Sequence, residues 1–163
     1  MSPLRVIRDA TTDDAALLAR IVNRAYEIER VFIDGDRTSP AEVKGHLATG
    51  RFLVLEEDNA PVGCVYLETN AARGYLGMLS VLPELQGGGR GRALVEAVES
   101  ACRKAGCVAV DLLVVDLRDE LHAFYRRLGY TLVGEKPWSE PRLKRPAHFF
   151  VYTKPLSRED GRR

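Results

Sequence analysis

The chain has 163 residues, enough for one domain with a single sizeable hydrophobic core. It contains 45% hydrophobic and 29% charged residues, the balance of an ordinary soluble globular protein, and its formal net charge of +1 favours neither nucleic acid nor a membrane as a partner. Three cysteines without a CxxC pair favour a reducing cytoplasm. No apolar run approaches the roughly 20 residues that a membrane helix needs, and no apolar signal segment begins the chain.

The first half of the chain is expected to contain two helices and four strands. Thr11 and Asp14 form a capping-box-like pair, and apolar residues at helical spacing continue from there to about residue 29. Pro40 lies in the first turn of a shorter second helix, and Gly50 follows its end. Strands are expected over residues 4–8, 52–56, 62–68 and 75–82, with a hairpin turn at 58–61.

The second half is expected to continue as helix, strand, helix and two strands. A helix with one apolar face follows Arg92 and stops at Gly106. Residues 107–115 are almost continuously apolar, as in a strand that is buried on both faces. The remaining elements are a helix over 119–128, strands over 130–133 and 148–153, and a polar loop over 136–146. A hairpin combined with a βαβ crossover indicates the α/β (α+β) class with a mixed sheet. We expect one domain over residues 1–156 and a polar tail over 157–163.

Residues 86–92, Gln-Gly-Gly-Gly-Arg-Gly-Arg, are the most informative segment of the chain. They lie between an expected strand and an expected helix. The N–H groups of such a loop and of the first helical turn have no intrahelical partners, and the helix dipole favours negative charge there. This order of elements therefore predicts a binding site for a phosphate-bearing ligand.

Two common phosphate-binding patterns do not fit this loop. A P-loop ends in Gly-Lys-Ser/Thr, whereas this loop ends in Gly91-Arg92-Ala93 and offers no hydroxyl for magnesium, which disfavours ATP and GTP. The dinucleotide fingerprint needs Gly or Ala at its last position, where the two registers place Arg92 or Leu94. Asp111 has the spacing of a ribose-binding acid, but it lies within a strand and not at the end of one.

The wider pattern resembles the coenzyme A signature of the GNAT superfamily of N-acetyltransferases. Gln86, Gly89 and Gly91 match the core of that signature, Gln/Arg-x-x-Gly-x-Gly/Ala. Farther along, Phe-Tyr-Arg-Arg-Leu-Gly-Tyr at residues 124–130 resembles the family's Phe-Tyr-x-x-x-Gly-Phe. The element order matches over residues 4–155. The resemblance implies the family's single-domain fold, in which helices flank a mixed, splayed sheet.

In this family the loop N–H groups bind the pyrophosphate of acetyl-coenzyme A, and glycines let the backbone approach closely. The resemblance implies that the two arginines either add charge or are solvated cations. In this chain it assigns coenzyme binding to Gln86, Gly87, Gly88, Gly89, Arg90, Gly91 and Arg92. A bulge in the preceding strand would free backbone groups for the pantetheine arm. Leu79 N–H would then polarise the thioester carbonyl, and Val81 would hold the arm through its backbone.

Tyr125 matches the family tyrosine that faces the coenzyme sulfur and donates a proton to the departing thiolate. An ordinary tyrosine has a pKa of about 10, so it carries its proton at pH 7. Helical spacing alone would make the same residue an aromatic core contact beside Phe124. The family often has Asn and Ala where this chain has Arg118 and Leu121. Arg118 stays a candidate for contact with the coenzyme or the substrate.

The acceptor amine must lose a proton before it attacks. For a lysine-like amine with a pKa of about 10.4, this costs roughly 4–5 kcal/mol at pH 7. Glu68, Asp111 and His122 are candidate bases, although Asp111 also fits a structural acid and His122 a residue on the helix surface. Family members do not share one general base, so the resemblance assigns none.

The sequence says little about the acceptor. In this superfamily the segment between the first two helices often walls the acceptor site, and its acids fit either a cationic amine or a solvated loop. The charged residues of this segment are Glu27, Glu29, Arg30, Asp34, Asp36 and Arg37. Three aromatic residues fit either an apolar acceptor pocket or the core: Tyr26, Phe32 and Trp138. The basic residues near them in sequence form a run too short to predict nucleic-acid binding: Lys136, Arg142, Lys144 and Arg145. The three histidines lack the spacing of metal ligands.

Together these features predict an acetyl-coenzyme A-dependent N-acetyltransferase that acts on a primary amine by direct transfer in a ternary complex, without a metal. No cysteine matches a nucleophile signature, which disfavours a covalent acetyl-enzyme. The alternatives are a catalytically degenerate coenzyme A-binding module and a dinucleotide-dependent oxidoreductase. The expected partners are acetyl-coenzyme A and a small-molecule or protein amine, with no nucleic acid or membrane. The acceptor, homodimer formation and the use of other acyl groups stay open.

Overall fold

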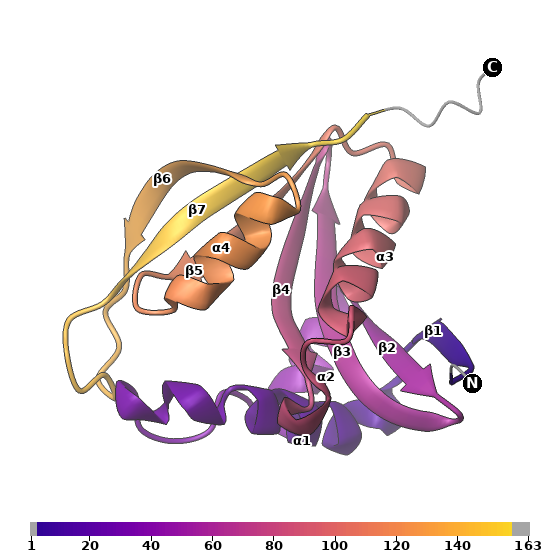
Figure 1. The fold of residues 1–163 in the computed structure, drawn as a ribbon, viewed down its shortest axis with the longest axis horizontal. Helices are drawn as coiled ribbons and strands as arrows, with labels where there is room; N and C mark the ends of the chain where they lie inside the picture. Colours follow the sequence, from indigo (N-terminus) through magenta and orange to yellow (C-terminus); the bar gives the residue numbers. More distant parts are fainter. Residues whose placement is uncertain (1–2, 158–163) are drawn as a thin grey trace.

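Seven strands form one mixed sheet in the computed structural model, which describes residues 3–157 (Figure 1). Their spatial order is β1-β2-β3-β4-β5-β7-β6, and every neighbouring pair is antiparallel except β4 and β5. The strands are β1 (Arg5–Asp9), β2 (Arg51–Glu57), β3 (Ala60–Asn70), β4 (Arg73–Val81), β5 (Ala109–Val115), β6 (Thr131–Pro137) and β7 (His148–Pro155). The expected α/β class, mixed sheet and element order are confirmed.

Four α-helices and three short 3₁₀ helices complete the fold within residues 3–157. They are η1 (Thr12–Asp14), α1 (Ala15–Ala25), η2 (Glu27–Val31), α2 (Pro40–Thr49), η3 (Pro83–Leu85), α3 (Arg90–Lys104) and α4 (Asp119–Arg127). The first helix is shorter than predicted, because regular α-helix ends at Ala25 and the chain tightens into η2, a common ending for an α-helix. None of the helices in the described part of the chain has the length and apolar character to span a bilayer. Of the predicted polar tail, only Ser157 lies within the described residues.

The two faces of the sheet carry separate hydrophobic clusters. On one face α3 and α4 pack on the strands through residues such as Leu94, Val98 and Tyr125. On the other face α1 and α2 pack through residues such as Leu18 and Val43. Amphipathic spacing in the sequence therefore translates into helices on both sides of the sheet (Figure 1).

The sheet opens between its two middle strands. β4 and β5 are paired only from Arg73 to Leu76 and from Ala109 to Leu112, while β5 stays paired with β7 as far as Val115. On its other side, β4 carries an extra residue opposite β3, since Cys64 and Tyr66 pair with Ser80 and Gly77. Met78 lies in this bulge with a φ of 51°. The bulge bends β4 away from β5 and leaves the V-shaped opening that Figure 1 shows.

Candidate active site

The larger cavity lies on the α3 and α4 side of this opening. Its volume is about 620 Å³, and it is lined by the bulged end of β4, the glycine loop, the first turn of α3, α4, and the segment after α1. Leu79, Val81, Gln86, Gly91 and Tyr125 all contribute to the lining. The strand, the loop and the tyrosine that the sequence singled out separately therefore surround one space.

The glycine loop has a backbone shape that needs glycine at two positions. Gly87 and Gly89 have φ values of 90° and 81°, which residues with a Cβ rarely adopt. Gly89 is the N-cap of α3, so the first N–H groups of a 15-residue helix face the cavity end of the loop. A Cβ on Gly91 would lie 3.3 Å from Cζ of Phe124, in the space between α3 and α4. The loop thus fits a group such as a diphosphate that needs close backbone approach and many N–H donors.

The polar side chains of the loop have different surroundings. Gln86 lines the cavity and donates a 3.1 Å hydrogen bond to the carbonyl of Val81, which ties the loop to β4. Arg90 turns toward the body of the protein, where it pairs with Glu57 at 2.8 Å and donates to the carbonyl of Leu85, and its side chain is outside the cavity lining. Arg92 lines the cavity and pairs with Glu96 at 3.0 Å. Of the two arginines, Arg92 is the one placed to meet a ligand.

Tyr125 reaches the cavity from the last turn of α4. Its side chain is only 5% exposed, and burial raises its pKa well above the ordinary value of 10.0. Among residues 3–157 no group makes a hydrogen bond with its hydroxyl, although the ring contacts Phe124 and Tyr130 edge-on. The hydroxyl therefore keeps its proton at physiological pH and has donor capacity available at the cavity wall.

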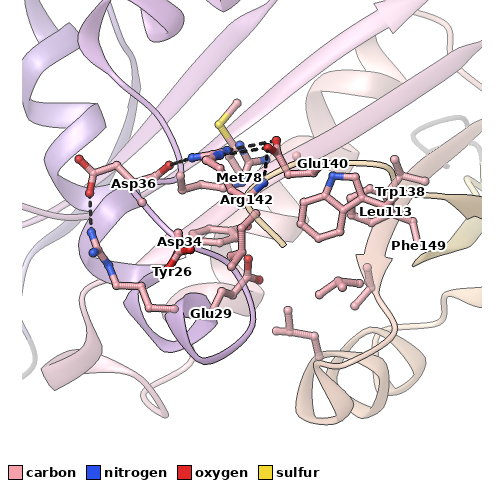
Figure 2. Close-up of a pocket in the computed structure, with 18 of the residues that line it drawn as sticks. Tyr26, Glu29, Asp34, Asp36, Met78, Leu113, Trp138, Glu140, Arg142 and Phe149 are labelled. Carbon is pink, nitrogen blue, oxygen red and sulfur yellow. Dashed lines mark hydrogen bonds and ion pairs between the residues drawn. The ribbon is translucent and has the colours of Figure 1, made fainter. Parts of the chain in front are cut away.

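A second, smaller cavity lies on the other side of the opening. Its volume is about 340 Å³, and it is lined by η2 and the segment after it, by β4 and β5, and by the loop between β6 and β7 (Figure 2). Tyr26 and Leu121 line both cavities, so the two spaces meet at these side chains. The arrangement thus has one space on each side of Tyr26 and Leu121, and Tyr125 lines the larger of the two.

The loop between β6 and β7 closes the smaller cavity by binding the segment after η2. Ile33 and Leu143 form an isolated antiparallel bridge, and the N–H of Lys144 donates to the carbonyl of Phe32 at 2.8 Å. Arg142 donates to the carbonyl of Asp36 at 3.0 Å, a contact drawn in Figure 2. Two segments that are more than a hundred residues apart thus form one wall, which the local pattern of the sequence does not reveal.

An ion pair lies between the two cavities. Arg118 lines the larger cavity and Glu29 the smaller one, and their side chains are joined by a 2.8 Å hydrogen bond. Glu29 is 7% exposed, and burial raises its pKa although the positive charge of Arg118 opposes the shift. The sequence grouped Glu29 with loop acids, but it is a buried carboxylate in the wall of the smaller cavity.

None of the three candidate bases lines either cavity. Glu68 accepts a 2.5 Å hydrogen bond from the hydroxyl of Tyr66, and Asp111 pairs with Arg73 at 2.7 Å. The expectation that His122 lies on the helix surface is wrong, because it is 6% exposed. Its Nε2 donates to the carbonyl of Val115 at 3.1 Å, which leaves Nδ1 to accept from the Tyr152 hydroxyl at 2.8 Å.

The structure thus brings together most of the residues that the sequence singled out. Lining the larger cavity are Leu79, Val81, Gln86, Gly87, Gly89, Gly91, Arg92, Arg118 and Tyr125; Gly88 and Arg90 are not in that lining. Sequence reasoning gave no ligand role to Arg24 and Arg127, which line the same cavity, and it grouped Glu27 of this lining with the acids of the acceptor segment. In the part of the chain that the structure describes, His, Cys, Asp and Glu side chains form no group of three that could hold a metal ion.

Comparisons with known proteins agree with this geometry. Residues 18–130 match the model of the acetyltransferase (GNAT) family. Among solved structures, the ribosomal-protein-S18-alanine N-acetyltransferase from Escherichia coli superposes with a TM-score of 0.80 at 17% identity, covering 98% of this chain and 99% of that one. The PaiA N-acetyltransferase from Thermoplasma acidophilum, in complex with coenzyme A, gives a TM-score of 0.77 at 17% identity, with coverage of 93% and 99%. At this level of identity the likeness shows the fold.

A third structure carries the acetyl donor itself. The protein yncA from Salmonella typhimurium, solved with its cofactor acetyl-CoA, gives a TM-score of 0.72 at 18% identity, and the match covers 96% of each chain. The family match spans the bulged strand, the glycine loop and the tyrosine helix together. It therefore covers every residue that lines the larger cavity and leaves out β1, β6 and β7.

Proposed function

Because the chain belongs to the GNAT acetyltransferase family, we propose that it transfers the acetyl group of acetyl-coenzyme A directly to a primary amine, with both substrates bound at once. The observation that carries this proposal is the enclosure of one cavity by Leu79, the glycine loop and Tyr125. The smaller cavity beyond Tyr26 and Leu121 then receives the amine. We assign the two cavities to donor and acceptor on this basis.

The glycine loop and the first turn of α3 would hold the diphosphate of the donor. The positive φ values of Gly87 and Gly89 support this role, and Gly91 lines the same cavity. Backbone N–H groups and the positive end of the helix dipole supply the attraction, and Arg92 adds a charge at the rim. The side chain of Arg90 serves instead to anchor the loop to Glu57.

The bulge in β4 would place a backbone donor against the reacting carbonyl. Leu79 follows Met78 in the bulge and lines the larger cavity next to the opening of the sheet. Its N–H can stabilise the oxyanion that develops on the thioester oxygen when the amine attacks. Val81, two residues on, lines the same cavity and can hold the pantetheine arm through its backbone.

Tyr125 would complete the reaction as the proton donor. As the amine nitrogen bonds to the acetyl carbon, the carbon–sulfur bond breaks and the departing thiolate takes the hydroxyl proton of Tyr125. Because its pKa is raised, the Tyr125 hydroxyl is protonated at neutral pH before the thiolate departs. The amine loses one proton before attack and another after it, and the second can restore the tyrosine through solvent. Glu29, in the wall of the acceptor cavity, is the acid placed to interact with the incoming ammonium.

The two alternatives gain no support from the geometry. A degenerate coenzyme-binding module would not need the hydroxyl of Tyr125, a buried residue in the lining of the larger cavity. A dinucleotide enzyme would need a ribose-binding acid at the site, and Asp111 is paired with Arg73 and lines neither cavity. For location we propose the cytoplasm, because Cys64, Cys102 and Cys107 are buried free thiols.

A thiol-release assay with acetyl-coenzyme A and a panel of small amines and peptides tests the function. We expect release that depends on the acceptor, and initial-velocity lines that intersect as both substrates are varied. Mass spectrometry of the protein after exposure to the donor alone should show no added acetyl group. A stable acetyl-enzyme with parallel lines would contradict direct transfer, and coenzyme binding without release for any acceptor would favour the degenerate module.

A further inference from the structure

The acceptor cavity contains an arginine that has no ionic partner within residues 3–157. Arg30 pairs with Asp36 at 2.6 Å, and Arg142 pairs with Glu140 at 3.2 Å. Arg37 lines the same cavity, but no carboxylate or hydrogen-bond acceptor of the described chain contacts it. Of the arginines that line this cavity, it is the one whose guanidinium is available to a ligand.

The position of Arg37 relates it to the junction of the two cavities. Its Cζ lies 5.3 Å from the centre of the Tyr26 ring, within the range of a cation–π contact. Tyr26 lines both cavities, so the guanidinium of Arg37 contacts a side chain at which the two cavities meet. An anionic group bound by Arg37 would therefore belong to a part of the substrate close to its reacting amine.

The opposite side of the cavity is apolar. Trp138 stacks on Phe149 with 4.6 Å between ring centres, and Leu113 lies beside them (Figure 2). Tyr26, Glu29 and Asp34 lie on the other side in the same view. Asp34 is largely exposed and lies 3.5 Å from Lys144, so it is already paired with a cation. The cavity thus presents a free cation and a buried acid on one side and a flat apolar wall on the other.

We propose that the acceptor is a free α-amino acid with an apolar or aromatic side chain, whose carboxylate is bound by Arg37. The amine and the carboxylate of such a molecule are attached to the same carbon. The amine can therefore face the junction and Glu29 while the carboxylate meets Arg37 and the side chain packs on Trp138. This inference rests on the proposed acetyl transfer and specifies its acceptor. Peptide N-termini and amines without a carboxylate would leave Arg37 unused.

Matched acceptors separate the carboxylate from every other feature of the substrate. L-phenylalanine, L-leucine and L-methionine are compared with their carboxamides and with the corresponding amines that lack the carboxyl group. The wild-type protein should use the acids with a kcat/KM roughly 10–100-fold higher than the carboxamides, as expected for a hydrogen-bonded charge pair. Amine basicity does not explain such a preference, because the carboxamides lose their proton more easily than the acids.

Arg37→Gln should remove this preference by lowering kcat/KM for the acids while leaving the carboxamides nearly unchanged. Arg20→Gln is the matched control, because Arg20 is an exposed arginine of α1 that lines neither cavity. Equal use of acids and carboxamides by the wild type, or an Arg37→Gln loss that is the same for both, would overturn the inference. Efficient use of peptides alone would also overturn it, while leaving the proposed acetyl transfer intact.

A binding measurement tests the inference even without turnover. In the presence of coenzyme A, N-acetyl-L-phenylalanine should raise the melting temperature of the wild-type protein more than its carboxamide does. Arg37→Gln should abolish the difference, and Arg20→Gln should keep it. If thiol release fails for every acceptor but this difference is present, the acetyl-transfer proposal fails and the carboxylate site stands. No difference between acid and carboxamide in the wild type would rule out the carboxylate site.

Discussion

Arg118 holds the carboxylate of Glu29 at 2.8 Å, and the two residues of this ion pair line different cavities. Arg118 also pairs with Glu120 at 2.7 Å, so one guanidinium forms ion pairs with a buried carboxylate and an exposed one. The pair stands between the proposed donor and acceptor sites. Its protonation state therefore bears on both the stability of the fold and the charge that an incoming amine meets.

The pH dependence of stability tests the state of Glu29. Burial raises its pKa in the folded protein above the ordinary 4.5, so the native state binds more protons than the unfolded state between these two values. The stabilising contribution is complete below pH 4.5 and is lost as pH rises through the raised pKa. Glu29→Gln removes this loss. Urea unfolding from pH 4.5 to 7.5 should show the variant gaining stability relative to the wild type as pH increases.

Glu120→Gln provides a control of opposite sign. Burial is the largest single effect and disfavours the ionised form of Glu120. The hydrogen bond from Arg118, the backbone hydrogen bond at Glu120 and the positive charge of Arg118 together outweigh burial and lower the pKa of Glu120 in the folded protein. Its contribution is present above the ordinary pKa and is lost as pH falls. Relative to the wild type, this variant should therefore lose stability as the pH rises from acidic values to about 4.5, and the difference should then stay constant up to pH 7.5. The same slope for both variants would show that Glu29 is not the group with the raised pKa.

Tyr125→Phe tests the proton donor. The substitution keeps the ring contacts and removes the hydroxyl, so kcat should fall by roughly 10²-fold or more while the Kd for coenzyme A stays within about twofold. Because the pKa of Tyr125 is raised, the wild-type kcat/KM should rise with pH as the amine deprotonates and should not fall again up to about pH 9.5. Unchanged turnover in the variant would remove the role of Tyr125 as proton donor.

Met78 tests the bulge that positions Leu79. Its φ of 51° is tolerable for an unbranched side chain and strained for a β-branched one. Met78→Ile should have a free energy of unfolding about 1–3 kcal/mol lower than that of Met78→Leu, measured by urea denaturation. Its kcat should also fall further than that of Met78→Leu. Met78→Leu is the matched control, since the two replacements have the same volume and polarity. Equal stability and equal activity of the two variants would contradict the claim that the bulge at Met78 positions Leu79 for catalysis.

The sequence predicted the element order, and it singled out the strand, the glycine loop and the tyrosine that line the larger cavity, because these follow from local patterns. Gly87 and Gly89 take the left-handed conformation, which the turn between β4 and α3 requires locally. The spacing of residues 124–130 places Tyr125 on the buried face of α4. The apolar run over residues 107–115 likewise became β5 in the middle of the sheet.

Long-range contacts were not predictable from those patterns. Arg90 has the residue type of a phosphate ligand, but Glu57 on β2 draws its side chain inward. Glu29 meets Arg118 across 89 positions of sequence, and His122 is covered by Tyr152 of β7. The acceptor cavity depends on the loop between β6 and β7 folding over η2. Periodicity gives the face of an element, but it does not show which distant partner that face meets.

A calorimetric titration with coenzyme A tests the central claim, that the glycine loop at the start of α3 holds the diphosphate. Gly91→Val would fill the space in front of Phe124, whereas Gly45→Ala changes a helical glycine with no atom within 4 Å of the added Cβ. We predict that Gly91→Val weakens binding at least tenfold, about 1.4 kcal/mol, and that Gly45→Ala binds like the wild type. Wild-type affinity in Gly91→Val, with its fold intact by circular dichroism, would contradict the claim.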